Sequence, residues 1–317
     1  KPYQRMSRAA LSAVTNTLRQ QARASALREF VTPAEREYFA SLFPKDGQAN
    51  LTVLPAVTYA REARQPLMRF FSTGLDETKP SYGLVLDNSK LSGPFVCITS
   101  IGAPNLPELR RACSELIDLS YERFVENKFY TILVDELSKE TIVDFASREL
   151  PNTSQHIYPV EQFYMNSEQI DNLLKLRLSL PDQFHYDTID IGKDLATVHT
   201  KWRHAEEMSS TRFLIDNYPS TCIRHTLSGK IAAWELSSPF GTLTHLYVME
   251  EFRGLGLGAT AELHLSQQLA RLRLRPYKYV ETFNSAVMRG THGHPLWTGC
   301  FEADGRPKRF IFIVLRT

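Results

Sequence analysis

The feature that most constrains this chain is a glycine-rich turn that joins a strand to a helix. The apolar run Leu246–Val248 is typical of a strand, and the stretch from Arg253 reads Arg-Gly-Leu-Gly-Leu-Gly-Ala. An apolar stripe at helical spacing follows, made of Ala259, Leu263, Ala270 and Leu274. Glycines let main-chain N–H groups approach a phosphate closely, and a helix start adds unpaired N–H groups and a positive dipole end. The pattern therefore predicts a diphosphate-binding turn, with Arg253 as an added cation.

A dinucleotide-binding turn is the main alternative. Gly254, Gly256 and Ala259 also satisfy G-x-G-x-x-G/A, and Glu281 follows where a ribose-binding acid is expected. In that pattern, however, the first glycine directly follows the strand, whereas here the charged segment 250–253 intervenes. Too few residues follow Glu281 to complete a doubly wound sheet. Tight packing of a helix on a sheet accounts for one or two glycines, but not for three with an arginine. We therefore interpret the turn as a site for the phosphates of an acyl carrier.

Composition narrows the class of protein further. A length of 317 residues, with 43% apolar and 23% charged residues, fits about two globular domains. No apolar run approaches the roughly 18 residues that a membrane-spanning helix needs, so no integral membrane association is expected. The four cysteines lie far apart without a CxxC pair, which is typical of a reducing compartment. No metal site is expected either, because His292, His294 and Cys300 lack the spacing and further ligand of one.

The first 28 residues differ from the rest of the chain. They contain six basic side chains and no acidic one, although the net charge of the whole chain is only +2. The remainder is thus net acidic, which argues against a nucleic-acid partner. Apolar residues in this segment lie at helical spacing, as in an amphipathic mitochondrial transit peptide with Met6 as candidate initiator. The alternatives are an ordinary N-terminal helix of a cytoplasmic protein and, less favoured without aromatic anchors, a membrane-surface helix.

Both halves of the chain read as helices with a mixed sheet, an α/β or α+β pattern. In the first half, Thr32-Pro33 opens a helix, and strand-like runs occur at Leu51–Tyr59, Tyr82–Leu86 and Phe95–Thr99. In the second half, hairpins precede the glycine turn. The first half could be a degraded copy of the second.

The segment Arg253-x-x-Gly256-x-Gly258 after a strand resembles the pyrophosphate-binding motif of the GNAT superfamily, the acyl-CoA-dependent N-acyltransferases. Over roughly residues 160–300 the chain is similar to glycine N-acyltransferases and their relatives. The likeness runs in order through Asp194–Trp202, Arg212-Phe213, Ile215–Cys222, Gly229 with Trp234, Glu251–Leu257, and Val280 to Asn284. The first half is similar only in length and pattern to that family's degenerate first domain. The resemblance implies tandem GNAT-like domains at 29–160 and 161–317, after the segment 1–28.

The resemblance also implies a reaction and a binding site. An acyl group passes from a CoA thioester to the amino group of glycine or a related small amine, with acyl-CoA as a substrate and no tightly bound cofactor. The pyrophosphate is held by main-chain N–H groups of Gly254, Leu255, Gly256, Leu257, Gly258 and Ala259. The pantetheine arm pairs with Leu246, Tyr247 and Val248. Asn284 matches an asparagine near the cofactor, although a helix cap is an equally good interpretation.

The proton acceptor is where the chain departs from the family. An ammonium must lose a proton before it attacks, and strand N–H groups then stabilise the oxyanion. The family glutamate position is Thr242, which cannot be the base but could hold a water. His245 is the nearest titratable residue, on the face opposite Thr242 unless a bulge intervenes. Glu281, at the end of the neighbouring strand, is an equal candidate. His199 and His204, five residues apart, are expected on different helix faces.

Two other functions stay open at this point. The substitution at Thr242 favours a catalytically weak acyl-CoA-binding protein as the first alternative. A GNAT enzyme for a different amine, such as an arylalkylamine or a polyamine, is the second. Acyl-CoA and a small amine are the partners expected for the main interpretation.

Overall fold

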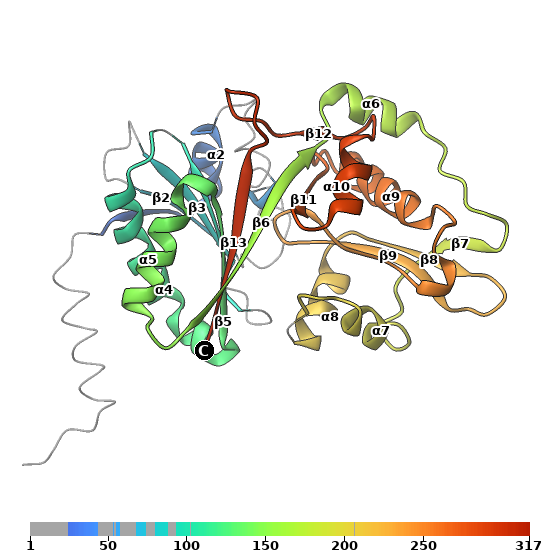
Figure 1. The fold of residues 1–317 in the computed structure, drawn as a ribbon, viewed down its shortest axis with the longest axis horizontal. Coiled ribbons are helices and arrows are strands. Elements are labelled where there is room, and N and C mark those ends of the chain that lie inside the picture. The colour runs from blue at the N-terminus through green and yellow to red at the C-terminus, as the bar shows by residue number, and fades with distance from the viewer. Residues whose placement is uncertain are drawn as a thin grey trace, which may run out of the picture.

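The computed structural model describes residues 25–43, 53, 55–57, 68–73, 80–87, 93–101, 103–205 and 207–317. Within them the chain forms one mixed sheet of 13 strands with helices on both faces (Figure 1). From edge to edge the strands are β1 (Leu27–Phe30), β2 (Met68–Thr73), β3 (Tyr82–Asp87), β4 (Phe95–Ser100), β5 (Phe129–Asp135), β13 (Arg309–Arg316), β6 (Ser154–Tyr164), β11 (Tyr277–Glu281), β10 (Leu243–Val248), β9 (Ile231–Ser237), β8 (Ser220–His225) and β7 (Phe184–Asp187). The remaining strand, β12 (Thr298–Gly299), pairs with β6. The predicted mixed α/β class is confirmed.

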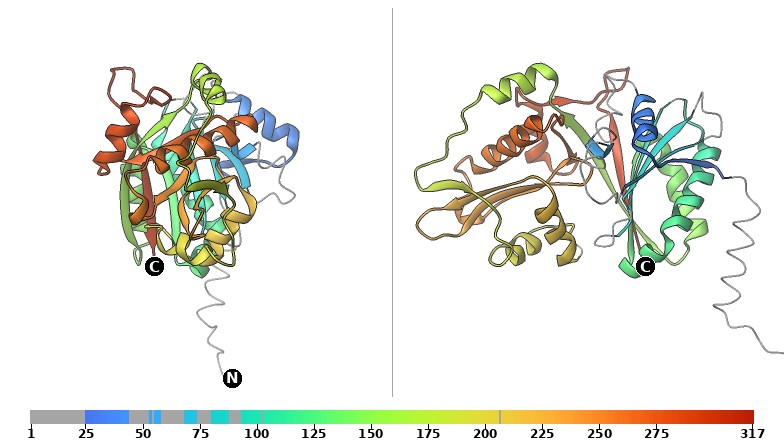
Figure 2. Two further views of the ribbon diagram at one scale, coloured as in Figure 1. Left: turned by 90° about the vertical axis from the view of Figure 1, so that its right-hand side faces the viewer. Right: turned by 180° about the vertical axis from the view of Figure 1, so that it is seen from behind.

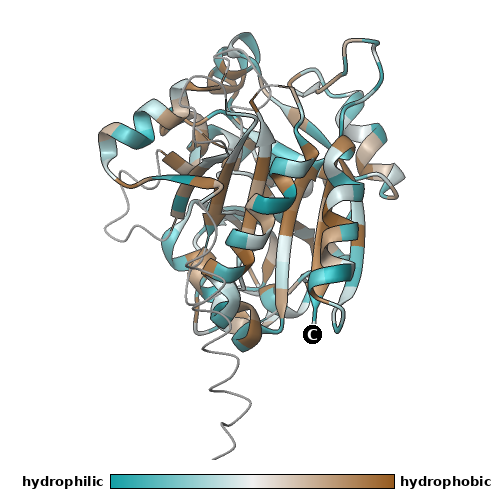
Figure 3. Ribbon diagram, turned by 90° about the vertical axis from the view of Figure 1, so that its left-hand side faces the viewer, coloured by the Kyte–Doolittle hydropathy of each residue, from teal (hydrophilic) through white to brown (hydrophobic). Residues whose placement is uncertain are grey.

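In the first half, helices cover both faces of the sheet. One face packs against α4 (Leu106–Asn127) and α5 (Lys139–Glu149), and the other packs against α2 (Pro33–Ser41). Figure 3 views this half from the side: the strands are mainly hydrophobic, and the helices in front of them carry hydrophilic residues outward. The buried faces of the helices therefore complete two apolar cores, one on each side of the sheet.

The second half has the same layered plan. Helix α9 (Leu257–Arg271), with α6 (Ser167–Lys175) and α10 (Ser285–His292), packs on one face of its sheet. The short helices α7 (Leu195–Thr200) and α8 (Met208–Asn217) pack on the other face (Figure 1). Because strands and helices follow one another in a similar order in the two halves, the fold has an internal repeat.

The two halves meet at β6 and β13, which cross the middle of the molecule (Figure 2). Strand β13, from the last residues of the chain, lies between β5 and β6 and is antiparallel to both. Strand β6 pairs first with β13 and then, from Val160 onward, with β11. The predicted division at residue 160 thus falls inside a strand shared by both halves, and the domain boundaries stay predictions.

Two local predictions can be compared with the structure. The helix start at Thr32-Pro33 is confirmed, since the Thr32 hydroxyl accepts a hydrogen bond from the main-chain N–H of Glu35 at 3.2 Å. The strand predicted at Leu51–Tyr59 is wrong, because Val53 and residues 55–57 are helical. Of the predicted leader-like segment 1–28, residues 1–24 lie outside the described residues. Strand β1 begins at Leu27, within the remaining part of that segment.

Candidate functional site

The glycine turn lies between β10 and α9, after a short 3-10 turn at Glu250–Phe252. Gly254 and Gly256 have φ angles of 80° and 77°, in the left-handed region that favours glycine. Gly256 is the N-cap of α9 and supplies no side-chain partner for the first N–H groups of the helix. A Cβ atom on Gly258 would lie 3.2 Å from Val248 Cγ2, so this glycine brings helix and strand close. The turn from Gly254 to Gly256 is exposed and accessible to a ligand.

Two cations lie beside this turn on the ring of Tyr247. The Arg253 guanidinium carbon lies 5.5 Å from the ring centroid, and Lys201 Nζ lies 5.7 Å from it. The Arg253 side chain also donates hydrogen bonds to the Val248 carbonyl (3.2 Å) and to the Tyr247 hydroxyl (3.3 Å). The tyrosine ring also stacks on Trp234, with centroids 5.1 Å apart. Positive charge is therefore fixed next to the predicted phosphate position.

Strands β10 and β11 are parallel neighbours, but they pair at one point only. Leu243 is in register with Lys278, and beyond it these two fully described strands form no further pair. On its other edge, β10 pairs with β9 and contains a bulge between Thr244 and Tyr247. His245 lies in this bulge with φ of 54°, which is the irregularity that the sequence left open. The parted strands and the bulge leave main-chain groups of β10 free of sheet pairing on the β11 side.

His245 is packed between two aromatic rings. Its Nε2 donates a hydrogen bond to the Val198 carbonyl of α7 at 2.8 Å, and its ring stacks on Trp202 with centroids 4.9 Å apart. Trp234 lies 5.7 Å away on another side. Burial lowers the pKa of His245 to about 4, with a smaller contribution from His199, and against the effect of the Val198 bond. The ring is thus neutral over the physiological range.

Glu281 is at the carboxyl end of β11 and pairs with His204. The sequence did not predict this pair. His204, in the turn after α7, donates from Nε2 to Glu281 Oε1 at 2.9 Å. Arg203 Nη1 is 3.8 Å from the other carboxylate oxygen. The His204 ring also contacts Tyr158 edge-on, with centroids 5.3 Å apart. The two residues of the pair are 77 positions apart in the chain, so no local signal connects them.

A buried acidic pair is a second feature that the sequence did not reveal. Glu235 of β9 is 2% exposed, and its Oε2 has no hydrogen-bond partner among the described residues. Glu262 of α9 accepts hydrogen bonds from Lys278 Nζ (2.6 Å) and from Trp297 Nε1 (2.9 Å). Burial, together with the charge of Glu262, holds the pKa of Glu235 well above its usual range, although Lys278 opposes the shift. Protonation of Glu235 is therefore favoured in the folded protein relative to an exposed glutamate.

The other two predicted residues have mainly local partners. The Thr242 hydroxyl, just before β10, donates to the carbonyls of Leu243 (3.3 Å) and Tyr277 (3.4 Å). Asn284 caps α10, because its Oδ1 accepts a hydrogen bond from the Val287 N–H at 3.3 Å. The cap interpretation of Asn284 is confirmed, and its role beside a cofactor stays a prediction.

A cavity of about 640 Å³ brings these residues together. From the second half it is lined by all three candidate catalytic residues and by Leu246, Asn284, His204 and Glu235. From the first half it is lined by aromatic and aliphatic side chains, among them Phe95, Leu133 and Phe312. Phe240, in the turn before β10, packs on Phe95 with centroids 4.7 Å apart. The cavity thus combines aromatic and aliphatic side chains from the first half with the candidate catalytic residues from the second.

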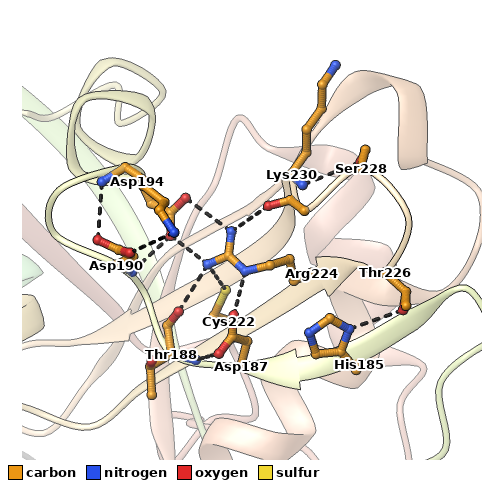
Figure 4. Close-up of polar contacts among 12 residues, drawn as sticks. His185, Asp187, Thr188, Asp190, Asp194, Cys222, Arg224, Thr226, Ser228 and Lys230 are labelled. Carbon is orange, nitrogen blue, oxygen red and sulfur yellow. Dashed lines mark hydrogen bonds and ion pairs between the residues drawn. The ribbon is translucent and has the colours of Figure 1, made fainter.

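A buried arginine anchors α7, the helix that precedes the lining residues Lys201–His204. Arg224 of β8 donates to the carboxylates of Asp187 and Asp194 and to the carbonyls of Thr188 and Gly229 (Figure 4). These hydrogen bonds, first those to Asp194, raise the pKa of Arg224, and Arg224 in turn lowers the pKa of Asp187. Since Asp194 is the residue before α7, the network anchors the helix that leads to Lys201 and His204.

The described residues contain neither a metal site nor a membrane-spanning helix. No group of three or more His, Cys, Asp or Glu side chains there has the arrangement of a metal site. His292, which the sequence analysis weighed as a metal ligand, donates a hydrogen bond to Glu161 at 3.2 Å. No helix in the described part is both long and apolar enough to cross a membrane.

Comparisons with known proteins agree with this geometry. The family model of FR47-like proteins matches residues 221–289, the segment of the bulge and the glycine turn. No curated protein matches the chain in sequence. Among solved structures, a Drosophila protein is 16% identical, covers 92% of this chain and 99% of its own, and has a TM-score of 0.72. A GCN5-related N-acetyltransferase from Sphaerobacter thermophilus is 9% identical over 92% of this chain and 96% of its own (TM-score 0.52).

A third structure is a tandem GNAT protein from the clavulanic acid biosynthesis pathway. It is 13% identical, covers 91% of this chain and 98% of its own, and has a TM-score of 0.50. At these identities the comparison concerns the fold. The fold is that of a tandem GNAT protein, and the matched family model supports the same superfamily.

Proposed function

We propose that this protein is an acyl-CoA-dependent N-acyltransferase whose acceptor is the amino group of glycine or a related small amine. The observation that carries the proposal is one continuous arrangement on β10 and α9. A bulged strand parts from its parallel neighbour and leads into an exposed glycine turn at a helix N-terminus. That arrangement supplies free strand edges for an extended arm and unpaired N–H groups for phosphates.

The acyl-CoA site is built on this segment. Main-chain N–H groups from Gly254 to Ala259 bind the pyrophosphate, and Arg253 and Lys201 add positive charge beside it. The pantetheine arm lies along Leu246–Val248, where β10 lacks a partner on the β11 side. Asn284, at the start of α10, faces the same cavity. The thioester then lies near the bulge.

The chemistry is an acyl transfer between sulfur and nitrogen. The acceptor ammonium loses a proton, its nitrogen attacks the thioester carbon, and main-chain N–H groups at the bulge stabilise the oxyanion. Candidates around the reacting atoms are His245, Glu281 and Thr242, all of which line the cavity. Thr242 is suited to holding a water, because a hydroxyl both donates and accepts.

Release of free thiol tests the proposal. The protein is incubated with acetyl-CoA or benzoyl-CoA and glycine, and free CoA is followed with a thiol reagent. We expect thiol release that depends on both substrates, and a panel of other amines then defines the acceptor. Binding of CoA without acceptor-dependent release would contradict the enzyme assignment.

A pair of glycine variants makes the test specific to the turn. Gly256→Ala and Gly305→Ala introduce the same side chain at φ angles of 77° and 84°, and neither Cβ meets another atom within 4 Å. Both variants therefore carry a similar backbone strain. We expect a loss of CoA affinity in calorimetry for Gly256→Ala alone, since Gly305 is in a remote turn.

A catalytically weak acyl-CoA-binding protein is the second candidate. The observation in its favour is Thr242, which occupies the family glutamate position and donates to main-chain carbonyls. Under this alternative, CoA binds with unchanged dependence on the glycine turn, but no amine increases thiol release above the uncatalysed rate.

We also propose delivery to the mitochondrion, with the cytoplasm as the alternative. The proposal is supported by the six basic and absent acidic side chains of residues 1–28. Fusing this segment to a fluorescent protein and imaging it in cells tests the proposal, and replacing its arginines by glutamine is the control.

A further inference from the structure

His204 and Glu281 form a hydrogen-bonded pair on the wall of the cavity. Nε2 of His204 donates to Oε1 of Glu281 at 2.9 Å, and both residues line the cavity. The histidine side chain is 41% exposed and the glutamate side chain 23% exposed. The pair is therefore neither buried in a core nor fully in solvent, and the histidine can exchange protons with water.

The pair and the bulge both lie beyond the point at which β10 and β11 part, and both line the cavity. From the single register pair Leu243–Lys278, three residues along each strand lead to Leu246 on β10 and Glu281 on β11. Leu246 belongs to the bulge, whose main-chain groups have no partner on the β11 side. The oxyanion donors and the His204–Glu281 pair thus flank the same part of the cavity.

We propose that His204 accepts the proton of the acceptor amine, with Glu281 as the residue that positions it. This inference rests on the proposed N-acyltransferase function and names its missing base. Because Nε2 donates to Glu281, Nδ1 of the neutral ring carries the lone pair. A carboxylate on the far nitrogen fixes the tautomer and stabilises the imidazolium that forms, as in other carboxylate–histidine pairs.

The step balances as follows. Nδ1 of His204 takes one proton from R–NH₃⁺, and the freed amine lone pair forms the C–N bond to the thioester carbon. The oxyanion collapses, the C–S bond breaks, and the sulfur leaves with the bonding electrons. The nitrogen of the new amide loses a second proton, which neutralises the CoA thiolate. His204 returns its proton to water, so the products are the amide, CoA thiol and one released proton.

Two other titratable groups in the cavity, His245 and Glu235, are less suited to this step. His245 donates its Nε2–H to Val198 and is held between rings, and its pKa of about 4 makes it a weak base. Glu235 is 2% exposed on β9, and burial raises its pKa well above the usual range. Around the pair itself, the charged and titratable neighbours are Arg203, 3.8 Å from Glu281, and Tyr158 of β6 against the His204 ring.

The experiment compares His204→Ala, His204→Gln and Glu281→Gln with the control His185→Gln. His185 is an exposed histidine on the edge strand β7 and bonds only to Thr226 within the described contacts. Thiol release with glycine and acyl-CoA is measured from pH 6 to pH 9, with CoA affinity measured separately by calorimetry. We expect kcat of both His204 variants to fall about 10²–10⁴-fold, with CoA affinity unchanged. Glu281→Gln should lose less, and the control should keep its activity.

Two readouts separate a proton acceptor from a structural residue. Added imidazole should restore part of the activity of His204→Ala but not of His204→Gln, whose side chain fills the space. The fall in rate toward acid pH in the unmodified protein should disappear in both variants. An active enzyme whose kcat changes less than about threefold in His204→Gln overturns this assignment alone. A protein that binds CoA but releases no thiol with any amine overturns the proposed function, and the assignment with it.

Discussion

The two halves of this molecule use the same order of elements around a parallel strand pair, yet they treat the helix N-terminus differently. In the second half, β10, α9 and β11 surround a helix start with a glycine cap and no acidic residue in its first turn. In the first half, β4, α4 and β5 surround a helix start where Asn105 accepts a hydrogen bond from the Glu108 N–H at 3.2 Å. Glu108 itself is buried in that first turn and accepts from Ser81 at 3.0 Å.

The difference shows that the same layers can contain two kinds of helix start, of which one suits the proposed phosphate site. A capped helix start with its own carboxylate has neither free donors nor the charge to hold an anion. The pairing of the parallel strands also differs between the two halves. Strands β4 and β5 share three register pairs, whereas β10 and β11 share one and then part. The first half therefore has the layers of the fold without the opening between parallel strands or the glycine cap, and it contributes Phe95 and Leu133 to the wall of the cavity.

The largest effect is expected from breaking the ion-pair network that anchors α7, a device of the second half. Replacing Arg224 by Met leaves Asp194, whose side chain is 6% exposed, without its cation. The free energy of unfolding should fall by about 3–5 kcal/mol, measured by urea unfolding. The control is Arg306→Met, which removes an exposed pair with Asp304 and should change the free energy of unfolding far less. Equal losses in both variants would contradict the anchoring role.

The second prediction introduces into the first turn of α9 an acidic residue like Glu108 of α4. The two helix starts should then both be unfavourable for an anion. Ala259→Glu places a carboxylate in the first turn of α9 at an exposed position. Repulsion of the phosphates should weaken CoA binding by about tenfold to a hundredfold, whereas the charge is favourable for the helix itself. Calorimetry measures the affinity. Leu227→Glu, in the hairpin turn after β8 and 90% exposed, adds the same charge elsewhere and should leave the affinity unchanged.

The buried carboxyl group of Glu235 should make the stability of the folded protein depend on pH. Because the pKa of Glu235 is raised in the folded state, the folded protein binds more protons than the unfolded chain above about pH 4.3. Its contribution to stability is therefore lost as pH rises. Gln resembles the neutral carboxyl group, so Glu235→Gln should weaken this loss between pH 5 and pH 8, by on the order of 1 kcal/mol. Urea unfolding across that range measures it, and a steeper decline in the variant would reverse the sign.

The smallest effect concerns the cap of the first half. Asn105→Ala removes the hydrogen bond to the Glu108 N–H and should lower the free energy of unfolding by about 1 kcal/mol. CoA affinity should not change, because this helix start is no phosphate site. A thermal unfolding scan with parallel calorimetry checks both. Weakened CoA binding in this variant would mean that the first half contributes to the nucleotide site.

Local patterns account for what the sequence could predict. Three glycines and an arginine after a strand need no distant partner to specify their turn, and the positive φ angles of Gly254 and Gly256 agree with it. The run Leu51–Tyr59 contains Val53 and Val57, and β-branched residues are typical of a strand, although the described residues of this run are helical. Yet Val53, Ala56 and Val57 are all buried, and their i, i+3, i+4 spacing is that of a helix face.

The parts of the site that escaped prediction depend on distant pairing. Strand alternation alone could not locate His245, because the bulge depends on how β10 pairs with β9. His204 is in a turn after α7 and meets Glu281 only when β11 lies beside that turn. The pKa of Glu235 is raised because the folded chain buries the residue and α9 brings Glu262 near it, against the effect of Lys278 from β11. A single sequence shows these residues, but it does not show which residues surround them in the folded chain.

Strand β13 has a consequence for the order of events at the ribosome. The neighbours that it joins, β5 and β6, are synthesised about 150 to 170 residues earlier, and each has an unpaired strand edge until β13 arrives. During translation the edges of β5 and β6 therefore stay open to pairing with another nascent chain. When β13 emerges, it fills the space between them and links the two halves through the sheet.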